Sequence, residues 1–192
     1  MRWNSKLVAS ITIGLACGLM FSCTKYQDPK TPDVDLEGRR YCNDPIAANY
    51  NHGFPGTPDN STCVYSTDFF AGNWQFVDSV FFDDFTFVRT DTYLLSMTPM
   101  DLSMDTLRNR ILVSGFCGAG QQLHITANKF GLAFTDTLLS NTDGGQVFCV
   151  ATDTVSGMFS VINDSLRNQM NIQLQHAAPD GKYLHIGKAI KQ

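Results

Sequence analysis

The chain has 192 residues, 43% of them hydrophobic, and its 14 Lys and Arg against 18 Asp and Glu give a formal net charge of −4. This length and apolar content suit one globular domain of ordinary size and exclude a wholly disordered chain. The mild negative charge excludes nucleic acid as a partner, because no basic surface could neutralise a run of phosphates.

The first 22 residues are predicted to be a signal peptide. Arg2 and Lys6 precede an uncharged stretch over residues 7–22, which is too short for a stable transmembrane helix and typical of an export signal. Residues 19–23 (Leu-Met-Phe-Ser-Cys) resemble the lipobox of bacterial lipoproteins, in the looser form common in Bacteroidota. The resemblance implies that residues 1–22 are removed and that Cys23 carries lipid, so a membrane is the predicted partner.

Two alternatives to lipidation at Cys23 remain open. Residues 15–17 (Leu-Ala-Cys) also look like the end of a lipobox, although cleavage before Cys17 would leave Cys23 as an odd thiol in an oxidising compartment. The other alternative is an ordinary export signal with a coincidental cysteine. Thr24 stands where enterobacterial lipoproteins kept at the inner membrane have Asp, so the resemblance implies the cell envelope and favours its outer membrane.

Residues 23–41 are predicted to be a flexible tether. They contain Pro29, Pro32, many charges and few large apolar residues, so they cannot bury much surface. Fully extended, such a segment would reach at most about 60 Å and would hold the folded part away from the membrane.

An even set of cysteines remains for disulfides, namely Cys42, Cys63, Cys117 and Cys149. In an exported chain this predicts two bridges, for which three connectivities exist. We expect Cys42–Cys63 and Cys117–Cys149. The segment between Cys42 and Cys63 is dense in Asn, Asp, Pro and Gly and has no core of its own, and closing it would contribute about 3 kcal/mol in the chain-entropy model.

Residues 42–65 resemble a short disulfide module of exported Bacteroidota proteins. Their start matches the pattern C-x-D-P-x-A-x-N-Y-N, whereas residues 53–58 are an insertion relative to it. The resemblance implies a spacer or a cap. The segment holds oxygen ligands of the type that calcium prefers, but their spacing fits no EF-hand and favours turn stabilisation, so we predict no metal site. These residues are Asp44, Asn49, Asn51, Asp59 and Asn60.

The body of the chain, residues 69–192, is predicted to be all-β. Apolar and polar residues alternate in several short runs, for example over 122–127, 130–135 and 170–175, and turn residues separate the runs. No window has a sustained helical period. A set of about eight to ten short strands predicts an antiparallel barrel or sandwich.

The start of this body resembles a known family. Gly72-Asn73-Trp74 is similar to the G-x-W start of lipocalins, and the strand layout over roughly 69–176 looks like the lipocalin-like domains of Bacteroidota lipoproteins. The resemblance implies a lipocalin-like (calycin) barrel whose base is closed by Trp74. Such a fold does not by itself fix a function.

The residues that could carry chemistry lack partners in the sequence. His124, His176 and His185 are separate and have no metal-binding spacing, and Asp83 and Asp84 are adjacent, which suits a turn better than an acid–base pair. The glycine-rich stretch 115–120 lacks the lysine and helix of a phosphate loop. We therefore predict no catalytic residue, no cofactor and no enzyme activity.

A short motif recurs along the body. Asp followed by Ser or Thr and an aliphatic residue resembles the O-glycosylation sequon of Bacteroidota, and the alternative is that these pairs begin turns and strand ends. The implied glycan sites are Ser79, Thr106, Thr137, Thr154 and Ser165.

Two functions from different classes fit these features. The first is a membrane-anchored binding module for an apolar ligand or an envelope protein partner, with an aromatic cluster that lines a cavity or fills the barrel core: Phe81, Phe82, Phe85 and Phe87. The alternative is a structural or adhesin-like surface protein without a small ligand. A filled barrel interior would argue against an internal ligand.

Overall fold

The computed structural model describes residues 38–52, 55–118, 121–136, 145–162 and 167–192, which all belong to one compact unit, Glu37–Gln192. The predicted signal peptide, Cys23 and most of the predicted tether lie outside the described residues, as do Thr137 and Ser165. Within the described ranges, no helix combines the length and the apolar character needed to cross a membrane.

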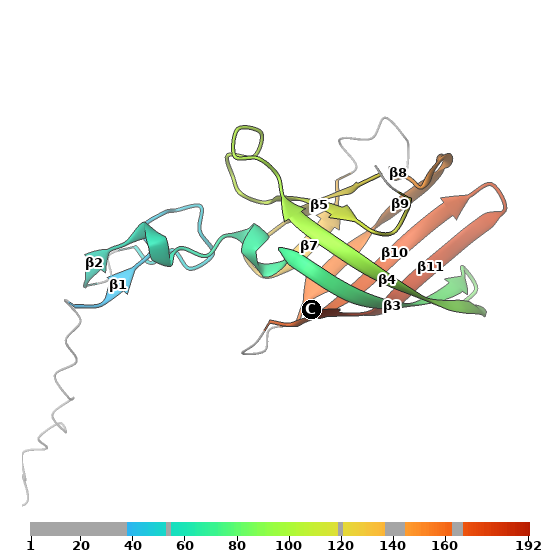
Figure 1. Cartoon of the computed structure of the whole chain (residues 1–192), viewed down its shortest axis with the longest axis horizontal. Helices are drawn as coiled ribbons and strands as arrows, with labels where there is room; N and C mark the ends of the chain where they lie inside the picture. Colours follow the sequence, from blue (N-terminus) through green and yellow to red (C-terminus); the bar gives the residue numbers. More distant parts are fainter. Residues whose placement is uncertain (1–37, 53–54, 119–120, 137–144, 163–166) are drawn as a thin grey trace, which may run out of the picture. The chain divides into compact units, whose positions relative to one another are not determined.

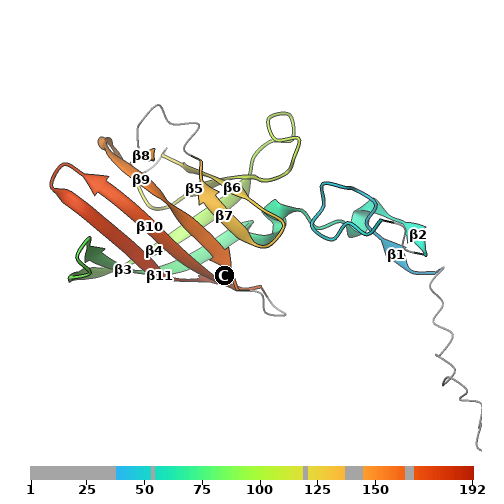
Figure 2. The same cartoon turned by 180° about the vertical axis from the view of Figure 1, so that it is seen from behind.

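Eight antiparallel strands form a closed barrel, which confirms the all-β prediction and selects the barrel over the sandwich. Each strand pairs with the next along the barrel, and the last pairs with the first. Figures 1 and 2 show the two sides of the wall, with β3 and β4 nearer in one view and β9, β10 and β11 nearer in the other. The strands are β3 (Gly72–Phe82), β4 (Phe87–Pro99), β5 (Arg110–Ser114), β6 (Leu123–Ala127), β7 (Leu132–Thr135), β9 (Val150–Val161), β10 (Gln169–Ala178) and β11 (Gly181–Lys191).

One end of the barrel, here called the capped end, is closed by the 3₁₀ helix η2 (Ser66–Phe69) and the residues after it. Phe69, Phe70 and Trp74 are all buried in the core, and the Trp74 indole N–H donates to the Phe70 carbonyl at 2.6 Å. The opposite end, here called the hairpin end, carries the turns between β3 and β4 and between β10 and β11. Trp74 therefore lies at the base of the barrel, as the lipocalin resemblance implies.

Large side chains fill the barrel interior. Alternate residues of the long strands point inward, as on any pleated strand, and pack into one core. The largest fully buried side chains are Trp74, Phe70, Phe76, Phe159, Leu95, Met97, Ile111, Ile125, Met170, Ile172, Leu174 and Val80.

The run over 130–135 forms a strand only from Leu132 to Thr135, and its large side chains do not face the core. Ala133 and Thr135 are buried, whereas Phe134 is half exposed and Phe130 is almost fully exposed. Phe159 is the direct partner of Ala133 across β7 and β9 and is itself fully buried. Because Ala133 is small, it leaves room in the core for Phe159, and the larger side chains of β7 face outward.

The aromatic cluster over 81–87 does not fill the core, so that alternative of the prediction is wrong. Phe82, Phe85 and Phe87 are exposed around the β3–β4 turn, and Phe85 has a φ of 65° in the left-handed region. Phe85 is thus a turn residue, whereas Phe87 is the first residue of β4. Phe81 and Phe87 make an edge-to-face contact at 5.7 Å on the outer wall.

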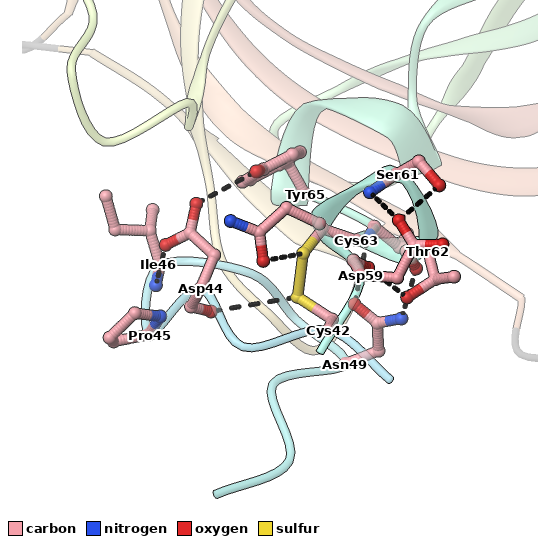
Figure 3. The surroundings of a disulfide bond; sticks show 12 residues. Cys42, Asp44, Pro45, Ile46, Asn49, Asp59, Ser61, Thr62, Cys63 and Tyr65 are labelled. Carbon is pink, nitrogen blue, oxygen red and sulfur yellow. Dashed lines mark hydrogen bonds between the residues drawn. A yellow bond between two sulfur atoms is a disulfide. The ribbon is translucent and has the colours of Figure 1, made fainter. Parts of the chain in front are cut away.

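The loop module is held by its disulfide and by polar side chains that bond to the backbone (Figure 3). Cys42 is bonded to Cys63. Asn49 accepts from the Val64 N–H at 2.8 Å and donates to the Thr62 carbonyl at 2.7 Å, while Asp59 accepts from the Ser61 N–H at 2.9 Å. These bonds support the turn interpretation, and the described residues hold no group of three or more His, Cys, Asp or Glu that could bind a metal ion.

The module begins earlier than predicted. β1 (Arg40–Tyr41) pairs in parallel with β2 (Thr57–Pro58), so the last two residues assigned to the tether belong to the module. The inserted stretch over 53–58 supplies β2 and thereby gives β1 its partner. Two residues of ordered pairing cannot be recognised from alternation, because alternation needs a longer run.

The second disulfide, Cys117–Cys149, confirms the expected pairing and crosses the hairpin end. It joins the loop after β5 to the junction of β8 (Gln146–Phe148) and β9. Near it, the Gln146 amide donates to the His124 carbonyl and accepts from the His124 N–H at 2.9 Å. A side chain thus bridges β8 to β6 in place of a backbone ladder.

Gly187 on β11 lies where the barrel wall is too closely packed for a side chain. A Cβ at Gly187 would overlap the Val77 carbonyl oxygen and approach the Phe76 ring at 2.9 Å. We expect Gly187→Ala to lower the free energy of unfolding by about 1–3 kcal/mol, measured by chemical denaturation. Gly118→Ala is the control, since a Cβ there meets nothing within 4 Å. Equal stability of the two variants would contradict the packing argument.

Asp44 gives the module a pH dependence. The Ile46 N–H and then the Tyr65 hydroxyl bond to its carboxylate and lower its pKa from the usual 3.8. A lowered pKa means that this stabilisation is present above the unfolded-state value and is lost as the pH falls through the folded value. We expect an NMR titration of the Asp44 carboxyl to have its midpoint below 3.8, and a midpoint at or above 3.8 would contradict these bonds.

Candidate functional site

Ionisable side chains gather on the inner face of the barrel near the hairpin end. We call this set the inner polar cluster, and it comes from five strands, β3, β4, β9, β10 and β11. β3 and β4 place Asp78 directly opposite Asp91, and β10 and β11 place His176 opposite Tyr183. The cluster consists of Asp78, Arg89, Asp91, Asp153, His176 and His185.

Each member of the inner polar cluster has a partner of opposite character. His185 Nδ1 and Asp78 Oδ2 are 2.6 Å apart, and His176 Nε2 and Asp153 Oδ2 are 3.1 Å apart. Arg89 Nε donates to Asp91 Oδ2 at 2.7 Å. The pairs differ in depth, because Asp78 and His185 are 0% and 6% exposed whereas Arg89 is 54% exposed. The cluster thus runs from the core to solvent at the hairpin end.

Aromatic rings surround these pairs. The His176 and His185 rings lie 5.6 Å apart, and Phe148 meets the His176 ring edge-to-face at 5.1 Å. Phe116 contacts both Phe148 and Tyr93, at 5.8 and 5.4 Å. The rings therefore occupy the space between the polar side chains, and a hollow of about 630 Å³, whose lining includes His176 and Tyr183, opens at this end.

The surroundings of the Tyr93 phenol shift its pKa. Burial raises the pKa of Tyr93 above its usual value, and the negative charges of Asp91 and Asp78 raise it further. The hydrogen bond to Asp91 raises the pKa of Arg89 as well. A neighbouring carboxylate raises the pKa of both groups, because it disfavours the phenolate of Tyr93 and favours the guanidinium of Arg89.

The deepest pair carries two unsatisfied atoms. Asp78 Oδ1 and His185 Nε2 are buried and make no hydrogen bond within the described part of the chain. A carboxylate and an imidazole could form the base of a catalytic triad, which needs a nucleophile on the free imidazole nitrogen. No described Ser, Thr or Cys hydrogen-bonds to that nitrogen, so the pair has the geometry of a structural contact.

The sequence predicted these histidines to be separate, and the structure corrects this. Asp78 and His185 are 107 positions apart and meet only because β3 pairs with β11. His176 and Asp153 meet because β10 pairs with β9. The sequence places His and Asp at inward positions of alternating runs, but alternation does not show which strands pair with one another.

The outer wall carries an open depression of about 760 Å³. Most of its lining comes from outward positions of β7, β9, β10 and β11 and from the β3–β4 turn. We call it the outer depression, lined by Phe85, Phe134, Thr135, Ser156, Gly157, Met158, Gln173, Leu174, Gln175, Leu184 and Ile186. None of these residues is ionisable.

Strand register organises the outer depression into two rows. Phe134 pairs with Met158, Met158 with Gln173, and Gln173 with Ile186. In the next row, Ser156 pairs with Gln175 and Gln175 with Leu184. Phe85 joins this lining from the β3–β4 turn with 68% of its surface exposed.

The described glycosylation candidates differ in accessibility. Thr106 is exposed, while Ser79 and Thr154 are partly buried. The preceding acids have structural roles, since Asp105 accepts from the Asn109 and Arg110 N–H groups, both at 2.7 Å. Asp78 and Asp153 pair with histidines, as described above. These bonds give the motif a structural purpose, and glycosylation stays a prediction.

Comparison of the sequence with protein-family models and with curated proteins finds no match. Among solved structures, one match is a protein of unknown function from the DUF3598 family of Nostoc punctiforme, with 10% sequence identity and a TM-score of 0.40. The match covers 66% of this chain and 49% of that one, so this chain spans about half of its length. A likeness of this size carries no argument, and the barrel assignment rests on the strand pairing.

The Asp78–His185 pair can be tested by a double-mutant cycle. We expect Asp78→Ala and His185→Ala each to destabilise the barrel, because each leaves a buried polar partner unpaired. The double variant should lose less than the sum of the two by about 1–3 kcal/mol, measured by chemical denaturation. Additive losses would show that the two side chains do not interact.

Proposed function

We propose that the chain is a lipid-anchored, non-enzymatic protein of the cell envelope whose barrel binds another envelope component through the outer depression. The lipobox-like residues 19–23 support the anchor and the envelope location. The two disulfides, Cys42–Cys63 and Cys117–Cys149, suit an oxidising compartment.

The filled interior favours binding on the outside. Ligand-binding lipocalin-like barrels need an internal cavity, whereas this one is occupied by apolar side chains at the capped end and by the inner polar cluster and its aromatic neighbours at the hairpin end. An apolar ligand inside the barrel, one of the two ligands expected from the sequence, is therefore disfavoured.

The outer depression is the observation that carries the proposal. Its volume of about 760 Å³ lies in the range of ligand sites, and Phe85 and Phe134 expose 68% and 49% of their surface around it. Exposed apolar side chains grouped around a hollow typically mark interaction sites. A purely structural protein has no need to leave these phenyl groups in water.

The proposal can be tested in cells that produce the full-length chain. A photo-crosslinking benzoylphenylalanine replaces Phe134, with native Cys23 or with Cys23→Ala. We expect Phe134→benzoylphenylalanine to form discrete adducts with envelope components when Cys23 is present. Cys23→Ala should release the protein from the membrane fraction and reduce these adducts, because an anchor raises the local concentration of membrane-bound partners.

The matched control is the same replacement at Leu94. This residue is 67% exposed on β4 and is not part of the outer depression. Adducts of equal yield from positions 94 and 134, or none from 134, would favour the structural alternative. Retention of Cys23→Ala in the membrane fraction would refute the anchor.

A further inference from the structure

We propose that the outer depression binds an uncharged carbohydrate chain. This inference rests on the proposed function, because it names the ligand class of the same surface. The chemistry of the lining residues indicates a neutral oligosaccharide or polysaccharide segment as the ligand.

The residues that line the outer depression are uncharged, which favours an uncharged ligand. The chain has 14 basic and 18 acidic residues, yet the eleven residues that line the outer depression include none of them. Phosphate, carboxylate and ammonium groups are recognised by oppositely charged side chains or by ordered backbone N–H groups. Asp83 and Lys182 line only the adjoining hollow, which shares Phe85 with this one, so a charged group bound among the eleven residues themselves would lose hydration without an ionic partner.

The lining nevertheless offers hydrogen bonds to a neutral ligand. Gln173 and Gln175 project outward from β10 at alternate positions, about 7 Å apart along the strand. Both are exposed, and neither side-chain amide hydrogen-bonds to another described residue. A primary amide has two donors and a carbonyl acceptor, which match hydroxyl groups that both donate and accept. Ser156, opposite Gln175, adds a hydroxyl.

Apolar groups flank these amides on both sides. In the first row, Met158 and then Phe134 lie on one side of Gln173, and Ile186 lies on the other. Sugar rings have the same division, with C–H groups on their faces and hydroxyls around their edges. A ring face can bury apolar area against Phe134 or Phe85 while its edge bonds to the amides.

A purely apolar partner fits this surface less well. Covering Gln173, Gln175 and Ser156 with apolar groups would remove water from three polar side chains without replacing their hydrogen bonds. A lipid chain or an apolar protein face would meet this penalty, whereas a polyhydroxylated chain would not. A protein partner remains as an outcome of the test.

The test uses the full-length lipoprotein in detergent micelles and a defined panel of probes. The neutral probes are maltoheptaose, cellohexaose, xylohexaose, mannohexaose and chitohexaose, and the acidic control probe is hexagalacturonic acid. Saturation-transfer NMR and calorimetry are run with each probe at about 5 mM, which detects dissociation constants into the millimolar range. We expect at least one neutral probe to bind, with transfer to ring C–H protons, and the acidic probe not to bind.

Matched variants locate the site. Phe134→Ala and the double variant Gln173→Ala/Gln175→Ala should each weaken binding of that probe by about fivefold or more, since each removes a contact of moderate strength. Leu94→Ala, on the wall outside the depression, should change it by less than about twofold. Denaturation curves of all the variants verify that they fold.

The outcomes separate the carbohydrate from the binding surface itself. No binding of any neutral probe, or binding that the two depression variants leave unchanged, overturns the carbohydrate inference. If adducts still form at position 134 in cells and are proteins, the proposed binding function stands with a protein partner. If adducts are also missing, both proposals fail.

Discussion

The structure depends on one ladder, in which the first and last strands of the barrel pair. β3 and β11 run antiparallel over nine residue pairs, from Trp74–Lys191 to Phe82–Tyr183. Because successive side chains of a strand point to opposite faces, this register decides for both strands which side chains enter the barrel. It brings Asp78 and His185 into contact inside and sets Ser79 opposite Ile186 outside.

The filled interior of the barrel favours a binding site on its outer surface. An eight-stranded barrel has an interior only just wide enough for its own side chains or one small ligand. Here Trp74, Phe76 and Phe159 occupy the core, and aromatic rings lie between the polar pairs of the inner polar cluster. The ligand-holding position of a lipocalin-like barrel is therefore taken, whereas the outer depression offers accessible binding groups on the wall.

Local patterns in the sequence predicted the strands, the turns and both disulfides, because alternation, turn residues and cysteine count are local properties. They did not predict the inward face of β7, where Ala133 faces the core because Phe159 opposite it fills the space. The outer depression was missed for the same reason. Gln173 and Phe134 become neighbours only through Met158 on the strand between them.

The inner polar cluster and the outer depression depend on the same registers. A buried polar pair such as Asp78 and His185 is a weak source of net stability, because desolvation offsets the attraction. The pair has a larger effect on incorrect strand registers. A one-residue slip of β3 against β11 would turn Asp78 outward and leave His185 buried without its carboxylate, at a cost of about 1–3 kcal/mol. Equivalent pairing of His176 with Asp153 links β9 to β10. The polar pairs inside thus disfavour slippage in strands whose outward faces carry Gln173, Gln175 and Ile186.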